Sequence, residues 1–128
     1  NAGGLISSLP LSEYGYVFEI KSDGQKNGLV IDYHMTDWYD NNDLYVEKGL
    51  LYNSVSIFAL IKNADYIQYN FSGSAYKVTR AAIEKHYPKY ETIVKNSKIN
   101  KDAFNQYVER KMNDYDFVES VFPVIKSL

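Results

Sequence analysis

Two stretches near the start of the chain alternate between apolar and polar residues, which is the pattern of half-buried strands. The apolar face of the first stretch would hold Tyr14, Tyr16, Phe18 and Ile20, and that of the second Leu29, Ile31, Tyr33 and Met35. Between them lie Asp23-Gly24 and Asn27-Gly28, and both pairs are typical of tight turns. We therefore expect a β-hairpin with strands over 14–21 and 28–36.

A run with helical spacing comes next. Leu51, Val55 and Phe58 fall on one side of a helix, and Leu50, Ile57 and Leu60 widen this apolar stripe. The spacing predicts a helix over 48–62. Alternation returns over 66–71, where Ile67, Tyr69 and Phe71 would face inward, and a fourth strand is expected over 75–78.

The remainder of the chain predicts short helices. The first covers 79–86 and ends before Pro88, and 89–99 has the character of a basic linker. Asn100 is a suitable N-cap for the next helix, whose inner face would hold Phe104, Tyr107, Val108, Lys111 and Met112. A last helix over 117–122 must end or kink at Pro123.

These elements predict an α+β fold. An antiparallel sheet of three to four strands would pack on one main helix, and the C-terminal helices would complete the core. Residues 1–13 would add an apolar hook at Leu5, Ile6 and Leu9. With 128 residues the chain has the usual length of one domain, so we expect a single domain over 1–128.

Composition narrows the function classes. The net charge of −2 argues against a nucleic-acid partner, and the lack of cysteine excludes disulfides and thiolate chemistry. The longest uncharged run, 49–61, is too short to cross a bilayer as a helix. No basic and apolar leader follows Asn1, so we expect a fragment or a processed form.

No motif in the sequence is a strong indication of a metal site or of catalysis. His34 and His86 lack further ligands at zinc spacing, and an acidic segment with carboxylates at 37, 40 and 43 does not match a calcium loop. Ser74 and Lys77 match a Ser-x-x-Lys pattern, but its companion motifs are missing. We therefore expect no metal, no cofactor and no enzymatic activity. A hydrolase that uses the carboxylates of the acidic loop, Asp37, Asp40, Asp43 and Glu47, is the third choice.

Binding surfaces remain as candidates. We expect residues 37–47 to form a polar, aromatic loop. Its aromatic side chains, beside its carboxylates, could stack on a sugar or cage a cation, or fold back over the sheet edge or the helix. This candidate ligand site holds Asp37, Trp38, Tyr39, Asp40 and Tyr45. A basic set could approach anionic lipid or wall polymers, or be an ordinary solvated face. It holds Lys77, Arg80, Lys85, Lys89, Lys95, Lys98 and Lys101.

Four segments of the chain carry a family resemblance. They are LLYNSVSIFALIKNADYIQYNF (50–71), NGLVIDY (27–33), ISSLPLSEYGYVFEI (6–20) and YKVTRAAI (76–83). They resemble an uncharacterised extracytoplasmic domain family, a domain of unknown function, of low-GC Gram-positive bacteria. Its members occur alone behind a membrane anchor or appended to membrane zinc peptidases of the beta-lactam-sensor and antirepressor type.

The resemblance implies a domain that is tethered outside the membrane and serves in sensing. It implies no catalytic residues. Within the family pattern, Phe58 and Leu60 would fill the core, Asn53 and Asn63 would satisfy backbone groups, and Arg80 would pair with an acid such as Asp65.

Our functional hypothesis is a non-enzymatic extracytoplasmic sensing or ligand-binding domain, anchored to the membrane through a segment outside this sequence and linked to cell-envelope or beta-lactam signalling. Its ligand would be a small molecule or a cell-wall fragment. The alternative is a structural module that docks on the ectodomain of a neighbouring membrane protein. A sensor predicts a concave pocket lined by some of Trp38, Tyr39, Tyr45 and Tyr66. A docking module predicts a flat apolar patch.

Overall fold

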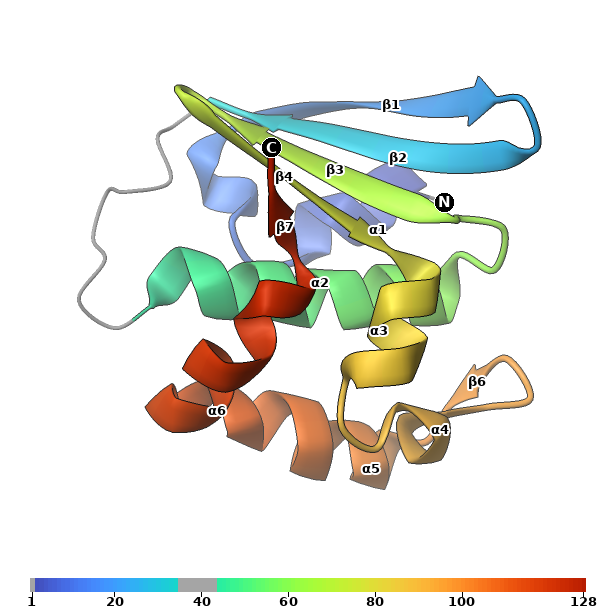
Figure 1. Cartoon of the computed structure of the whole chain (residues 1–128), viewed down its shortest axis with the longest axis vertical. Coiled ribbons are helices and arrows are strands. Elements are labelled where there is room, and N and C mark those ends of the chain that lie inside the picture. Colours follow the sequence, from blue (N-terminus) through green and yellow to red (C-terminus); the bar gives the residue numbers. More distant parts are fainter. Residues whose placement is uncertain (1, 35–43) are drawn as a thin grey trace.

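The computed structural model describes residues 2–34 and 44–128, and places a sheet, a central helix and the C-terminal helices in three layers (Figure 1). The sheet has the strand order β1-β2-β3-β4-β7. Its strands are β1 (Tyr16–Asp23), β2 (Lys26–Tyr33), β3 (Tyr66–Phe71), β4 (Ser74–Thr79) and β7 (Lys126–Ser127). The helices are α1 (Ala2–Ser8), α2 (Tyr45–Leu60), α3 (Arg80–His86), α4 (Tyr90–Ile93), α5 (Lys101–Phe104) and α6 (Tyr115–Val121). This architecture confirms the α+β prediction.

The pairing of β2 with β3 differs from the prediction of an antiparallel sheet. These strands are parallel, in a register that runs from Gly28 opposite Tyr66 to Asp32 opposite Asn70. The reason is the connection between them: α2 crosses beneath the sheet and returns the chain to the same end, as parallel strands require. The other pairs, β1–β2, β3–β4 and β4–β7, are antiparallel.

Helix α2 is the centre of the core. It begins at Tyr45, three residues before the predicted start, and most of its surface is buried, since the sheet covers one side and the C-terminal helices the other (Figure 1). Phe58 is buried as expected, whereas Leu60 is 56% exposed, so its predicted place in the core was wrong. Leu60 is the last residue of the helix, beyond the reach of both covering layers.

Two polar side chains inside the core, Ser54 and Asn53, form hydrogen bonds, although the Asn53 Oδ1 atom has no partner among the described residues. The Ser54 hydroxyl donates to the carbonyl of Leu50, one turn earlier, and lies 2.9 Å from the Tyr69 hydroxyl. The amide of Asn53 donates to the carbonyl of Pro10, which confirms the predicted backbone partner and ties the N-terminal segment to α2. Such bonds offset much of the cost of burying polar groups.

Strand β1 is more exposed than predicted. Phe18 and Ile20 do face the helix layer, opposite Ile31 and Leu29, but they are 37% and 68% exposed. Because β1 is the edge strand, the helices beneath the sheet do not cover it fully (Figure 1). The residue predicted to start this strand, Tyr14, lies instead in a 3-10 turn over Ser12–Tyr14.

Two segments form structure that was not predicted. Residues 89–99, expected to be a linker, form α4 and a small hairpin of β5 (Val94–Lys95) and β6 (Lys98–Ile99). The hairpin closes through Asn96 and Ser97, which both adopt positive φ angles, as a two-residue turn requires. The N-terminal hook is helical, as α1, and buries Ile6 and Leu9 as expected.

The remaining predictions hold with small shifts. Thr79 caps α3 and Asn100 caps α5, each by accepting a bond from a backbone amide three residues on. Helix α5 continues as a π turn and a 3-10 turn, Asn105–Glu109 and Arg110–Asn113. The last helix, α6, begins at Tyr115 because Asp114 caps it, two residues before the predicted start.

The second covering layer of α2 suggests a truncation test. A chain that ends at His86 would lose α4 to β7 and expose one side of a helix that carries buried residues over most of its surface. We expect this fragment to lose its cooperative thermal transition in circular dichroism and to bind a hydrophobic dye. A chain that ends at Ile125 loses only β7 and the final residue, and should still melt cooperatively. A cooperative transition in the fragment ending at His86 would contradict this account.

Buried tyrosines make stability depend on alkaline pH. Burial raises the pKa of Tyr33, Tyr69 and Tyr87 above the ordinary value of about 10. Above that pH the unfolded phenols ionise while the folded ones stay neutral, so the free energy of unfolding should fall as pH rises past about 10. Urea unfolding at a series of pH values would show this. The Y87F variant should have a shallower decline, by up to about 1.4 kcal/mol per pH unit, whereas Y115F, at an exposed site, should match the parent chain.

Candidate functional site

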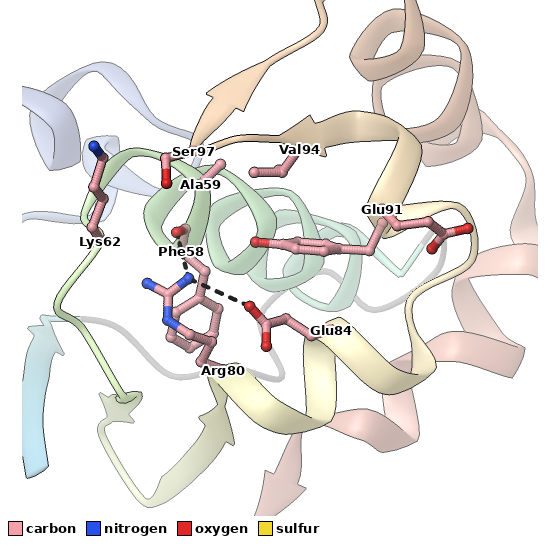
Figure 2. Close-up of a pocket in the computed structure, with 9 residues that line it drawn as sticks. Phe58, Ala59, Lys62, Arg80, Glu84, Glu91, Val94 and Ser97 are labelled. Atoms are coloured by element: carbon pink, nitrogen blue, oxygen red, sulfur yellow. Dashed lines mark hydrogen bonds and ion pairs between the residues drawn. The ribbon is translucent and has the colours of Figure 1, made fainter.

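The candidate site is a hollow of about 460 Å³ beside the end of α2 (Figure 2). Three segments build it: the last turn of α2, the first turns of α3, and the stretch from α4 through the β5–β6 turn. Its lining residues are Phe58, Ala59, Lys62, Arg80, Glu84, Tyr90, Glu91, Val94 and Ser97. We name it the α2–α3 hollow.

Arg80 forms one wall of the hollow and closes the end of α2. Its Nε donates to the carbonyl of Ala64 at 2.8 Å, while Nη1 and Nη2 donate to those of Phe58 and Ile61 at 2.8 and 2.6 Å. The final carbonyls of a helix lack partners within it and carry partial negative charge, so a cation suits this position. The guanidinium also lies 5.0 Å from the centre of the Phe58 ring.

The acidic partner predicted for Arg80 was wrong. The Asp65 carboxylate accepts a hydrogen bond from the backbone amide of Asn27 at 2.8 Å. The bond between Asp65 and Arg80 is a main-chain one, in which the Arg80 backbone amide donates to the Asp65 carbonyl. The acid that faces the guanidinium is Glu84, one helical turn away, with the charged atoms 3.9 Å apart (Figure 2). The guanidinium therefore bonds to backbone carbonyls rather than to the Asp65 carboxylate. Because every residue has a backbone carbonyl, the sequence could not identify these partners.

The floor of the hollow is aromatic and contains an unsatisfied hydroxyl. Phe58 and Tyr90 are both buried, and the Tyr90 hydroxyl has no hydrogen-bond partner among the described residues. Burial raises the pKa of this phenol, and Arg80 opposes the rise through its charge and through a polar contact with the hydroxyl that falls short of a well-aligned hydrogen bond. A buried hydroxyl without a partner is costly, and a polar ligand atom could satisfy it.

The charged residues of the hollow balance one another. Lys62 and Arg80 supply two positive charges, and Glu84 and Glu91 two negative charges. Figure 2 shows Lys62 and Glu91 on opposite sides of the hollow, with Arg80 and Glu84 between them. This arrangement suits a small ligand that itself carries both charges, with its apolar part on the aromatic floor.

A second hollow of about 680 Å³ adjoins the first, since Arg80 and Glu84 line both. In it the Lys77 ammonium lies 4.4 Å from the centre of the Tyr66 ring. That ring in turn covers Gly28: a Cβ at this position would lie 1.9 Å from the Tyr66 Cζ. These contacts stabilise the β2–β3–β4 sheet, and we assign them a structural role.

Most of the candidate site expected from sequence falls on residues that the structure does not describe. Asp37, Trp38, Tyr39 and Asp40 are outside the described residues. Tyr45 begins α2, donates a hydrogen bond to the Glu13 carboxylate and lines a mostly apolar hollow of about 280 Å³ with Tyr52 and Met112. Tyr66 lines a different hollow, so the structure does not bring these two tyrosines together.

Other candidate groups are also separated. The basic set is spread over β4, α3, the N-cap of α4, the β5–β6 hairpin and α5, although Lys77 and Arg80 line the same hollow. Ser74 and Lys77 lie three residues apart on β4, and residues at that spacing in a strand point to opposite faces. Within residues 2–34 and 44–128, the structure forms no cluster of three or more side chains suited to a metal ion.

Sequence reasoning missed the α2–α3 hollow because its walls are far apart along the chain. Arg80 was recognised as a residue that needs a partner, but the end of α2, which it contacts, was not identified as that partner. The short segment over 89–99 that supplies Tyr90, Glu91 and Ser97 had been assigned to a linker. Its apolar residues Tyr90 and Ile93, both buried, were the available signal of structure there.

The role of Arg80 can be tested by substitution. R80Q removes the charge and most of the bonds to three carbonyls, and we expect it to lower the free energy of unfolding by about 3 kcal/mol. R80K should lose nearly as much, since one ammonium cannot reproduce a planar fork of donors. E84Q serves as the control, because a half-exposed pair at 3.9 Å is worth less than about 1 kcal/mol. Chemical denaturation would measure all three, and an R80Q loss no larger than that of E84Q would contradict the capping role.

Comparisons with known proteins complete the description. In the described part of the chain, every helix is too short or too polar to span a membrane. No curated protein and no solved structure matches the chain. A family model does match, over residues 1–85, and its description is "Domain of unknown function (DUF4825)". This match covers β1 to β4, α2 and nearly all of α3, including Arg80 and Glu84. The chain therefore belongs to the DUF4825 family.

Proposed function

We propose that this protein is a non-catalytic sensing or ligand-binding domain, and that the α2–α3 hollow takes a small ligand carrying both a positive and a negative charge. The observation that carries the proposal is the composition of the hollow. Two acids and two bases surround an aromatic floor whose Tyr90 hydroxyl is buried without a partner. Such a site would recognise its ligand by pairing with its charged groups and by stacking against its apolar part.

The lining residues favour binding over catalysis. A nucleophile needs an adjacent base to activate it. The described lining residues hold one aliphatic hydroxyl, that of Ser97, and no histidine that could activate it. Arg80 is already occupied by three carbonyls and so acts best as a fixed wall. The charged groups of the hollow that remain for a ligand are those of Lys62, Glu84 and Glu91.

We propose a ligand of peptide-like chemistry, such as a cell-wall fragment with a free amine and a free carboxylate. The carboxylate would lie toward Lys62 and Ser97, and the amine toward Glu84 and Glu91. The family resemblance supports placing the domain outside the cytoplasmic membrane of a Gram-positive bacterium, tethered by a segment outside these residues and serving envelope or beta-lactam signalling. The absence of cysteine suits that compartment.

Docking on a neighbouring protein is the second candidate function. The observation that favours it is the exposure of apolar side chains on both faces of β1: Phe18 and Ile20 on the helix side and Val17 on the opposite side. The two functions use different parts of the molecule: the hollow lies at the end of α2, and β1 is the outer edge of the sheet (Figure 1). They are therefore separable by substitution.

The ligand proposal is tested by titrating the isotope-labelled protein with the zwitterionic dipeptide Ala-Ala and following its backbone amides by NMR. Millimolar dipeptide should shift the amides of Glu84, Glu91 and Ser97. K62Q and E91Q should each weaken binding about tenfold, the loss of about 1.4 kcal/mol.

Matched controls identify the hollow as the site. K101Q and E119Q remove the same charges from exposed positions on α5 and α6, and should leave the affinity unchanged. A dipeptide blocked at both ends should bind weakly or not at all. The proposal fails if Ala-Ala leaves the amides of the hollow unmoved, or if the blocked dipeptide binds equally well.

A further inference from the structure

The two edges of the sheet are unlike. On one side the sheet ends in β7, which pairs over only two residues, Lys126 and Ser127. On the other it ends in β1, which has eight residues and pairs with β2 along its whole length without a bulge. Proteins ordinarily protect a long edge with proline, bulges or unpaired lysine, because its free backbone groups invite another strand.

Strand β1 lacks that protection. It contains no proline, and its one lysine, Lys21, lies 3.7 Å from Glu19 on the same strand, which neutralises the charge. At its centre Ile20 is 68% exposed, and Phe18 and Val17 are 37% and 55% exposed. A small hollow of about 170 Å³, lined by Ile20, Leu29 and Ile61 among others, lies under the edge.

The hydrogen bonds between β1 and β2 show which residues of β1 have free backbone groups that could pair with another strand. The amide of His34 donates to the carbonyl of Gly15 at 2.9 Å, which makes this a hydrogen-bonded pair. Such pairs alternate along an antiparallel ladder, so the odd-numbered residues of β1 direct their backbone groups at β2. The even-numbered residues, Tyr16, Phe18, Ile20 and Ser22, direct theirs outward.

We propose that β1 pairs antiparallel with β1 of a second copy of this chain, about a twofold axis at Ile20, joining the two sheets. The outward groups of one copy must meet those of the other, so even-numbered residues oppose even-numbered ones. Centring on Ile20 aligns residues 17–23 of both copies. It sets Ile20 against Ile20 and Phe18 against Ser22, with their side chains on the helix side of both sheets.

Charge complementarity selects this register among its neighbours. With the axis at Ile20, Glu19 of each copy lies opposite Lys21 of the other, in a pair where side chains approach most closely. Moving the axis to Glu19 or to Lys21 would place like charges directly opposite each other. Moving the axis to Phe18 or Ser22 also sets even-numbered residues opposite each other. It shortens the paired segment within β1 to five residues for Phe18 and to three for Ser22.

The interface is tested with charge reversals in the full chain, by sedimentation velocity over a range of concentrations. The parent protein should form a dimer as concentration rises. E19K and K21E should each weaken self-association at least tenfold, since each puts like charges opposite at two places. An equimolar mixture of E19K and K21E should form a heterodimer, and the double variant E19K/K21E should dimerise like the parent.

Two controls address charge and folding. E119K makes the same change in net charge on an exposed face of α6 and should leave dimerisation intact. In the parent protein, hydrogen exchange at the amides of Phe18, Ile20 and Ser22 should slow as concentration rises, which reports the interface without any substitution. A parent protein that stays monomeric at millimolar concentration, no concentration dependence at those amides, or no association in the mixture would each overturn the proposal.

Discussion

The guanidinium of Arg80 occupies the place where the central helix ends, and the rest of the molecule is arranged around that contact. Because layers cover α2 on both sides, its last carbonyls depend on protein donors, and Arg80 supplies three hydrogen bonds to this region. Its own backbone amide bonds to Asp65 at the start of β3. One residue thus joins α2, α3 and the sheet, and the same side chain forms a wall of the α2–α3 hollow. Stability and the candidate site share a component here.

Local patterns predicted the elements well. The hairpin, α2, β3, β4 and α3 all follow from periodicity, and the cap at Asn100 follows from residue type, since these signals act over a few neighbouring positions. Relations between distant elements were less accessible. The parallel pairing of β2 and β3 depends on the path of α2, and the exposure of β1 depends on how far the helix layer extends beneath the sheet. The β5–β6 hairpin escaped prediction because Asn96 and Ser97 are only moderate signals of a two-residue turn.

The candidate site was harder to foresee than the fold. Sequence reasoning favoured a polar aromatic loop over 37–47. Of its five candidate site residues, Tyr45 alone lies among the described residues, in contact with Glu13. The α2–α3 hollow combines residues from three separate segments, and no motif links them. Arg80 was recognised as a residue that needs a partner, and an acid was the natural expectation. Its actual partners are main-chain carbonyls, which every residue type provides equally.

The contact between Gly28 and Tyr66 has a consequence for how this sequence can diverge. The two residues are paired across the parallel strands, and the ring occupies the space that any side chain at position 28 would need. A larger residue at position 28 would displace the Tyr66 ring and so disrupt the contact between this ring and the Lys77 ammonium. Related chains should therefore change these positions in concert, with a bulkier residue at one accompanied by a smaller residue at the other. An alignment that varied them independently would mean that the backbone in that lineage had moved.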